Sequence, residues 1–358
     1  MDRFEAPVTV PADLRRRFVV GTVLAGLTTF VFLLWIVLDI GGGRVTDGVD
    51  DVGELIAALA AAVLCGMTAL RPSSSRAGWA LLAASSLSWA AGEAAWTYFD
   101  LVKGVQVPFP SLADVGYLVA VPLACAALLL FPGSPRARHR ILGLLDGCII
   151  ATSLLFASWA TILGPLYRAH HGGVLKQVLS LAYPMSDVVM MSLVIILIAR
   201  VGQQARMSVG LVMAGVVAFA MADSAFSYMT EVNNYGSGTF LDTGWVAGYL
   251  LIGLGALRAM TSPSRDVVPA QDTSISLVVP YVPVLVVLAV TAVQLVRGRH
   301  IDPAAWTMAF ALVVLVLGRE VLRLRDLAII ARRPPHDVDR SQGPRSHRPE
   351  PDSALVIR

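Results

Sequence analysis

Five acidic residues lie inside long apolar stretches of the sequence, where a charged group is costly. They are Glu54, Glu93, Asp146, Asp187 and Asp223. No Lys, Arg or His occurs in these stretches before Arg319, so we expect the acids to have no basic partners. An unpaired carboxyl group in a medium of low dielectric is protonated, solvated in a wet cavity, or neutralised by a bound ligand. Ligand binding or proton transfer is therefore the chemistry that these residues could do.

Two of the acids belong to segments that resemble each other, residues 88–128 and 218–257. Each segment contains an acid, a Tyr five residues later, a loop, a second acid, and an aromatic residue three positions further on. The matching pairs are Glu93 and Asp223, Tyr98 and Tyr228, Asp114 and Asp242, and Tyr117 and Trp245. Unrelated amphipathic hairpins could share a few acids and aromatic residues. Four positions that match in register nevertheless favour an internal duplication.

The composition indicates that helices in a lipid bilayer position these residues. Of the 358 residues, 56% are hydrophobic and only 15% are charged, against about a quarter charged in a water-soluble globule. The apolar runs are continuous rather than alternating, which favours helices over a barrel. We predict an all-α polytopic membrane protein with about ten transmembrane helices. Their approximate bounds are 18–40, 52–70, 77–99, 114–131, 141–163, 178–199, 209–230, 240–258, 275–296 and 304–325.

The basic residues indicate how these helices cross the membrane. With the N-terminus in the cytoplasm, the inner segments hold 22 of the 28 Lys and Arg residues and the outer loops hold 6. Because cytoplasmic loops carry the excess of basic residues, we expect both termini on the cytoplasmic side of the inner or plasma membrane. The duplication then relates spans two to five (about 52–163) to spans six to nine (about 178–296) as parallel repeats.

In this topology the duplicated acids and aromatic residues gather towards the outer side. We predict an outward-facing pocket between the repeats for a cation, or for a cationic or polar ligand, held by charge and cation–π contacts. Its expected contact residues are Glu93, Asp223, Asp114, Asp242, Tyr98 and Tyr228. Alternatively, the aromatic residues form the interfacial belt and the acids are protonated or hydrogen-bonded. A proton or ion relay would instead use Asp187, Asp146 and Glu54.

Several other classes of site have no support in the sequence. All six histidines lie in expected loops or in the tail, which disfavours intramembrane zinc chemistry with His ligands. The three cysteines lie inside spans without a disulfide framework or metal-finger spacing, so we expect them to pack as small apolar residues. No phosphate-binding loop and no H-E-x-x-H motif occurs. We therefore predict no catalytic residues, no metal centre, no cofactor and no nucleic-acid partner.

Four strings carry a resemblance to a known family: PFPSLADVGYLVAVPL (108–123), LLDGCIIA (144–151), LAYPMSDVVMMSL (181–193) and LDTGWVAGYLL (241–251). Together with the acid-to-Tyr spans, they resemble the N-terminal multi-helix membrane domain of actinobacterial GGDEF and EAL signalling proteins, which make and break cyclic-di-GMP. The resemblance covers roughly 52–330. It implies a sensory or anchoring module whose last helix passes a signal to a cytoplasmic output domain.

The sequence departs from that family at its C-terminal end. It contains no GGDEF or EAL string, so the family's catalytic activities are not carried over and any output would reside in a cytoplasmic partner. The segment 318–333 has apolar residues at near-heptad spacing, which is compatible with a homodimer helix or simply with a basic helix end. The tail 332–358, rich in Pro and Arg, is predicted to be disordered.

The sequence thus predicts three parts: a cytoplasmic arm (1–17), a membrane domain (18–331) and the tail. We interpret the protein as a non-catalytic membrane sensor or scaffold that couples an outward acidic and aromatic pocket to a cytoplasmic partner through the last helix. The alternative is a small-solute or proton-coupled transporter. Parallel repeats, proline-kinked spans and the mid-membrane Asp187 would all suit that alternative.

Overall fold

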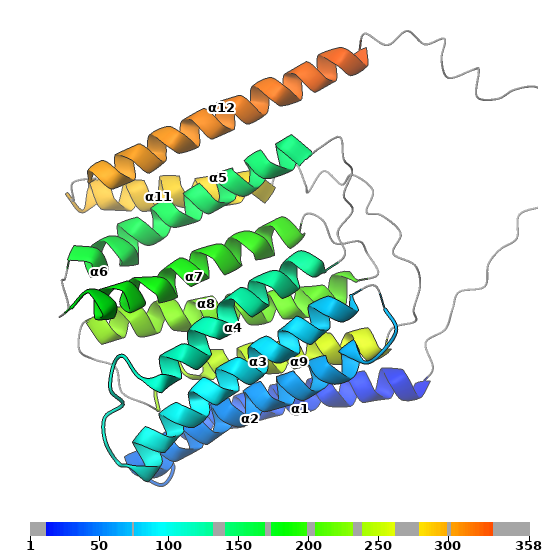
Figure 1. Cartoon of the computed structure of the whole chain (residues 1–358), viewed down its shortest axis with the longest axis vertical. Helices are drawn as coiled ribbons and strands as arrows, with labels where there is room; N and C mark the ends of the chain where they lie inside the picture. Colours follow the sequence, from blue (N-terminus) through cyan, green and yellow to red (C-terminus); the bar gives the residue numbers. More distant parts are fainter. Residues whose placement is uncertain are drawn as a thin grey trace, which may run out of the picture.

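The computed structural model describes residues 12–73, 75–131, 140–168, 173–198, 205–231, 238–261, 279–298 and 302–331. Over these ranges it is a bundle of ten long helices that run side by side, with no strand (Figure 1). The long helices are α1 (Ala12–Val37), α2 (Gly43–Ala69), α3 (Arg76–Thr97), α4 (Leu112–Leu130), α5 (Arg140–Ser158), α7 (Val174–Ile198), α8 (Arg206–Glu231), α9 (Thr243–Thr261), α11 (Val282–Val296) and α12 (Pro303–Ala331). Shorter elements extend some of them: η1 (Tyr98–Val102), η3 (Trp159–Leu163), α6 (Gly164–Arg168) and η4 (Val279–Tyr281).

Nine helices in the described ranges are long and apolar enough to cross a membrane. The prediction of an all-α multi-pass membrane protein is therefore confirmed. The predicted span at 77–99 corresponds to α3, which has the length of a span but is not among these nine. Its polar side chains Ser85, Ser86 and Glu93 are buried against neighbouring helices. Because they do not face lipid, α3 tolerates a polarity that a lipid-exposed helix would not.

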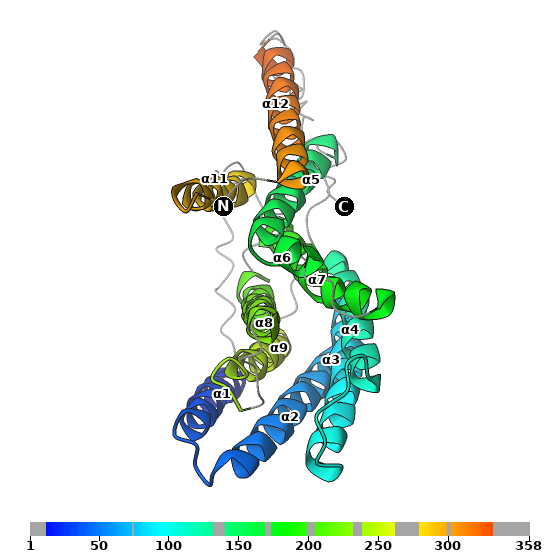
Figure 2. The ribbon, with the colours of Figure 1, turned by 90° about the vertical axis from the view of Figure 1, so that its left-hand side faces the viewer.

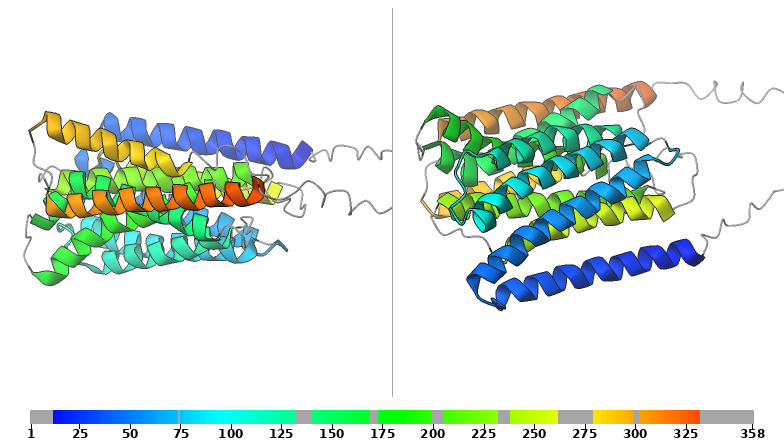
Figure 3. Two further views of the ribbon diagram at one scale, coloured as in Figure 1. Left: turned by 90° about the horizontal axis from the view of Figure 1, so that it is seen from above. Right: turned by 60° about the horizontal axis from the view of Figure 1, so that its bottom comes forward.

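Helix α1 begins and helix α12 ends at the same end of the bundle, here called the terminal end (Figure 3). Helices α2, α4, α7, α9 and α12 begin at the opposite end, because each follows a helix that starts at the terminal end. The predicted tail at 332–358 lies outside the described residues, and α1 already begins at Ala12, within the predicted arm.

The helices form a six-helix core and a flank. The core consists of α2, α3, α4, α7, α8 and α9, with α1 packed on α9. The flank consists of α5, α11 and α12, in which α5 packs against both other helices. Seen along the helices, the flank lies at one edge of the bundle and α1 and α2 lie at the other (Figure 2). Helix α7 joins the two parts, because it packs against α4 and α8 in the core and against α5 in the flank.

Helix packing in the core repeats under exchange of its two halves, α2–α4 and α7–α9. Helix α2 packs on α3 of its own half and on α9 of the other. Helix α7 likewise packs on α8 of its own half and on α4 of the other. This exchange is what a two-fold axis along the membrane normal produces. Spans five (α5) and nine (α11) do not follow this exchange. Helix α5 packs on α7, whereas α11 packs mainly on α5.

The pairing of helices within each half depends on small residues. A methyl group on Gly116 of α4 would lie 2.5 Å from the backbone nitrogen of Gly92 of α3. At the matching place, a methyl group on Gly244 of α9 would lie 2.9 Å from the Cβ of Ala222 of α8. The backbones therefore approach so closely that no larger residue fits, which is typical of helix pairs in membranes.

Helix α2 begins nine residues before the predicted span at 52–70, at Gly43. The early start places Asp50 and Asp51 inside the helix, where each side chain is buried. The expectation that this segment is a loop is wrong, because it is helical from Gly43 onwards. The backbone N–H of Gly238 donates to Asp50 Oδ2 at 2.7 Å.

Candidate functional site: an acid-lined cavity in the core

A cavity of about 180 Å³ lies between the two halves of the core. Seven carboxyl side chains line it: Asp50, Asp51, Glu54, Glu93, Asp114, Asp187 and Asp223. No Lys, Arg or His is found among the described residues of its lining. Uncompensated carboxyl groups in a medium of low dielectric require protons, water or a bound cation. The cavity is therefore suited to a positively charged occupant.

The two halves hold their matched acids in the same way. On one side, the Tyr117 hydroxyl of α4 donates to Glu93 of α3 at 2.7 Å. On the other, the Trp245 indole N–H of α9 donates to Asp223 of α8 at 2.7 Å. In both cases the first helix of a pair carries the acid, and the second helix carries the aromatic donor. The residues that match in the sequence thus play equivalent roles in space.

The second matched pair of acids, Asp114 and Asp242, stabilises the start of the following helix. Asp114 accepts a hydrogen bond from the Ser111 backbone N–H at 2.6 Å, completing a capping box. Asp242 accepts one from the Thr239 backbone N–H, also at 2.6 Å. Each acid takes up a backbone donor three residues earlier. Asp114 and Asp242 therefore play equivalent roles in the two halves, as Glu93 and Asp223 do.

The equivalence also reaches α2 and α7. Tyr183 and Asp187 of α7 follow Asp50 and Glu54 of α2 by 133 residues and lie in corresponding places. Asp187 faces Asp223 within its half, as Glu54 faces Glu93 within the other. Across the halves, the Tyr183 hydroxyl donates to Asp114 at 2.5 Å. In the place that corresponds to this hydrogen bond, between α2 and α9, two acids lie close together, Asp50 and Asp242.

Aromatic rings form the wall of the cavity where the halves meet. Trp89 of α3 and Phe219 of α8, which differ by the same 130 residues as Glu93 and Asp223, lie 5.8 Å apart between ring centres. The ring of Tyr249 lies 4.9 Å from Trp89 and 4.7 Å from Phe219. Acids and aromatic faces therefore share one cavity, which is the combination that binds organic cations.

Of the six predicted contact residues, Glu93, Asp223 and Asp114 line the cavity. Asp242 lies directly behind it, fully buried beside Asp50 and Glu54. Tyr98 does not reach the cavity: it begins η1, is 46% exposed, and has the Lys103 ammonium 5.6 Å from its ring centre. The side chain of Tyr228 lies outside the described residues.

Of the three predicted relay residues, Asp187 and Glu54 line the cavity and Asp146 does not. Asp146 lies on α5 in the flank, where the Arg319 guanidinium of α12 donates to it at 2.5 Å. The expectation that every acid within the spans lacks a basic partner is thus wrong for Asp146. The two residues are 173 positions apart in the chain, so only the packing of α5 on α12 brings them together.

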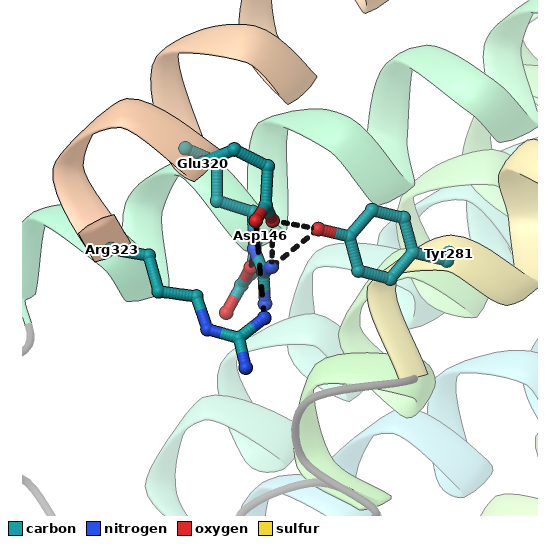
Figure 4. Close-up of polar contacts among 5 residues, drawn as sticks. Asp146, Tyr281, Glu320 and Arg323 are labelled. Atoms are coloured by element: carbon teal, nitrogen blue, oxygen red, sulfur yellow. Dashed lines mark hydrogen bonds and ion pairs between the residues drawn. The ribbon is translucent and has the colours of Figure 1, made fainter. Parts of the chain in front are cut away.

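Arg319 belongs to a polar cluster in the flank, of which Figure 4 labels Asp146, Tyr281, Glu320 and Arg323. It is 4% exposed and also donates to the Tyr281 hydroxyl at 2.6 Å and to Glu320 at 3.0 Å. Tyr281 points its hydroxyl at Glu320 and donates to it. Helices α5 and α12 and the element η4 are thereby joined near the terminal end.

A second group joins the flank at the opposite end. Asp302, just before α12, accepts hydrogen bonds from the Trp159 indole and from Arg168, and it caps α12 through the Ala305 backbone N–H at 2.8 Å. Burial by itself would raise the pKa of Asp302, but the hydrogen bonds from Ala305, Trp159 and Arg168 lower it below the ordinary value. Asp146 and Asp302, which lie towards opposite ends of the flank, therefore each have an arginine partner.

Six residues of the site were not predicted: the acids Asp50 and Asp51, Tyr183, and the aromatic residues Trp89, Phe219 and Tyr249. The acids at positions 47, 50, 51 and 54 recur at intervals of three and four residues, which is the period of one helix face and could have indicated that the helix starts early. Tyr183 lies in the motif LAYPMSDVV, four residues before Asp187, on the same face of its helix. Nothing in the local sequence indicates that its hydroxyl meets Asp114.

Comparison of the chain with protein-family models, with curated protein sequences and with solved structures finds no match. The function must therefore be inferred from the cavity itself.

Proposed function

We propose that the protein is a membrane sensor that binds a small organic cation in the core cavity and passes the signal to the cytoplasm through α12. One observation carries this proposal: seven carboxyl side chains surround the cavity and no basic residue compensates them within the described lining. A cationic ligand would supply the missing positive charge. The rings of Trp89, Phe219 and Tyr249 favour an ammonium group with apolar substituents over a hydrated inorganic ion.

The topology supports a ligand that comes from outside the cell. The excess of Lys and Arg on one side favours cytoplasmic termini, which puts the opposite end of the bundle outside. Glu93, Asp114 and Asp242 all lie towards that end, at the last turn of α3 and at the starts of α4 and α9. The cavity would then receive its ligand from the outer side.

A chain of packed helices leads from the cavity to α12. Tyr183 and Asp187 of α7 line the cavity, and α7 packs against α5. Helix α5 is joined to α12 by the ion pair between Asp146 and Arg319. A displacement of α7 by the ligand would reach α12 through these contacts. The resemblance to sensory modules with an output at the end of the last helix supports the same route, with segment 318–333 presented to a cytoplasmic partner.

The test is binding of tetramethylammonium to the purified protein in nanodiscs, measured by calorimetry and by the shift of the thermal midpoint against sodium at equal ionic strength. We expect binding by the wild type and at least a ten-fold loss in the double variant Glu93→Gln, Asp223→Asn. Asp302→Asn, the same kind of change in the flank, is the matched control and should bind as the wild type does. Absence of binding by the wild type, or equal loss in the control, contradicts the proposal.

A transporter is the second candidate, favoured by the contact between Asp187 and Asp223. Two facing carboxyl groups between parallel repeats are suited to exchanging a proton for a cationic substrate. The distinguishing measurement is uptake of labelled tetramethylammonium into proteoliposomes driven by a proton gradient. Uptake that Asp187→Asn abolishes would establish transport. Binding without uptake would support the sensor.

A further inference from the structure

Three carboxyl groups converge where α2 meets α9 at the opposite end of the bundle. Oxygen atoms of Asp50, Glu54 and Asp242 all lie within 4.8 Å of one another. Their side chains are nearly removed from solvent, with exposures of 3%, 6% and 0%. If ionised, such acids repel one another strongly, so they hold protons or have a cation between them. Acidic groups also gather without a ligand, however, so the cluster alone decides nothing.

The other half of the core provides an internal comparison. There, Tyr183 occupies the place that corresponds to Asp50 and donates a hydrogen bond to Asp114, the counterpart of Asp242. The seam between α4 and α7 is therefore closed by a donor and an acceptor. At the seam between α2 and α9 the tyrosine is replaced by an acid, so that the carboxyl groups of Asp50 and Asp242 face each other. The second seam therefore carries one more carboxyl group than the first.

Unused oxygen atoms point to an absent ligand at this seam. Asp50 Oδ1 is buried and has no hydrogen-bond donor among the described residues, although Oδ2 is held by Gly238. Asp51 is not one of the three converging acids, yet its Oδ2 is also buried without a donor in the described part of the chain. Its side chain is 3% exposed and lines the same cavity as Asp50 and Glu54. Buried oxygens left in this way are rare in native proteins unless a ligand, ion or water satisfies them.

We propose that Asp50, Glu54 and Asp242 bind a hard divalent cation, Ca²⁺ or Mg²⁺, at the seam between α2 and α9. Carboxylate oxygens alone, without His or Cys, are the donor set that these ions prefer over transition metals. Asp51 and the buried Thr243 hydroxyl, which has no partner among the described residues, offer further oxygens nearby. The ion would join the two halves of the core, because α2 and α9 belong to different halves.

This site goes beyond the organic-cation site of the proposed function. Two of its ligands, Asp50 and Glu54, line the cavity, but Asp242 lies behind the cavity, so the ion would lie at the seam and not among the aromatic rings. A divalent ion bound there would compensate the acids of the seam. Glu93, Asp187 and Asp223 would remain for the organic cation.

The test is equilibrium binding of ⁴⁵Ca²⁺ to the wild type in nanodiscs of purely zwitterionic lipid, which excludes binding to lipid headgroups. We expect one ion per chain, and at least a ten-fold loss of affinity in Asp50→Asn and in Asp242→Asn. Asp114→Asn is the matched control, because it makes the same change at the corresponding position of the other half. It should bind Ca²⁺ as the wild type does.

A second measurement shows whether the variants fold. In EDTA the thermal midpoints of Asp50→Asn and Asp242→Asn should equal or exceed that of the wild type, because each variant removes one repelling carboxylate. Only the wild type and Asp114→Asn should then gain stability on addition of Ca²⁺. Asp242→Asn should also keep the binding of tetramethylammonium, so that failure of this inference is distinguishable from failure of the proposed function. No Ca²⁺ binding by the wild type, or undiminished binding by both seam variants, would overturn the inference.

Discussion

The acids of the core and those of the flank have different kinds of partner. In the flank, Asp146 is paired with Arg319, and Asp302 with Arg168. In the core, the acids that line the cavity have only aromatic donors, backbone N–H groups or each other as partners within the described residues. Both regions are helical and membrane-embedded, so the difference lies in the side chains and not in the architecture.

We interpret the flank acids as structural and propose that the core acids bind a ligand. A buried ion pair contributes little net stability, but loss of one partner is costly because the other charge stays buried. A buried cluster of like charges shows the reverse behaviour, since removal of one member relieves repulsion. We therefore expect substitutions in the two regions to change stability in opposite directions. The following predictions test that contrast, from the largest expected effect to the smallest.

Arg319→Met should lower the free energy of unfolding by about 2 kcal/mol, because it leaves Asp146, whose side chain is 26% exposed, and the Tyr281 hydroxyl without the buried guanidinium that they share. The measurement is thermal or denaturant unfolding in detergent. The double variant Arg319→Met, Asp146→Leu should recover most of the loss, because no unpaired charge remains. A single variant as stable as the wild type would show that the ion pair does not hold the flank together.

Asp187→Asn should leave the protein without ligand as stable as the wild type, or more stable by up to about 1 kcal/mol. The reason is that Asp187 faces Asp223 and its Oδ2 has no donor among the described residues. The measurement is the thermal midpoint in ligand-free buffer. A clear loss of stability would mean that Asp187 is a structural acid of the same kind as Asp146, and the contrast would fail there.

Trp89→Leu should weaken tetramethylammonium binding roughly five-fold, the equivalent of about 1 kcal/mol for one aromatic face. Trp89 lines the cavity. Trp79→Leu is the matched control, because Trp79 is also buried but packs on Phe131 and does not line the cavity. Calorimetry of the folded variants should show unchanged affinity for the control. Equal losses in both variants would argue against an aromatic contact with the ligand.

Acidification should produce a small effect in the flank. Because the pKa of Asp302 is lowered in the folded state, its ionised form stabilises the fold above the ordinary value, about pH 4. This contribution is lost as the pH falls through the lowered pKa. The difference in thermal midpoint between the wild type and Asp302→Asn should thus be constant near neutral pH and shrink below about pH 4. Asp302 is partly exposed, so we expect a difference well under about 1 kcal/mol. A difference that grows on acidification would reverse the sign and refute the assignment.

The sequence predicts the helices well because lipid requires long continuous apolar runs. Such runs are local, so they can be recognised without knowing which helices pack together. It also predicts the equivalent roles of Glu93 and Asp223, since a duplication preserves spacing. The polar helix α3 is also predicted as a span, although a buried Glu93 is tolerated there only because neighbouring helices shield it from lipid.

The parts that escaped prediction depend on contacts between distant segments. The pairing of Asp146 with Arg319 and that of Tyr183 with Asp114 each require two helices to be placed. The burial of Asp50 depends on the loop at Gly238, which lies 188 residues further along the chain. A local pattern shows which face of a helix is polar, but not what covers that face.

The close approach of Gly116 to Gly92 has a mechanical consequence. Because the backbones of α3 and α4 nearly touch, and those of α8 and α9 do so as well, neither pair can shear without a clash. Motion is left to the two seams. The seam between α4 and α7 is fastened by Tyr183, and the seam between α2 and α9 is fastened towards the terminal end, where Thr68 of α2 and Arg71 just after it donate to the Ala256 and Met260 carbonyls of α9. We expect any opening of the core to begin at the other end of the α2–α9 seam, where Asp50, Glu54 and Asp242 converge.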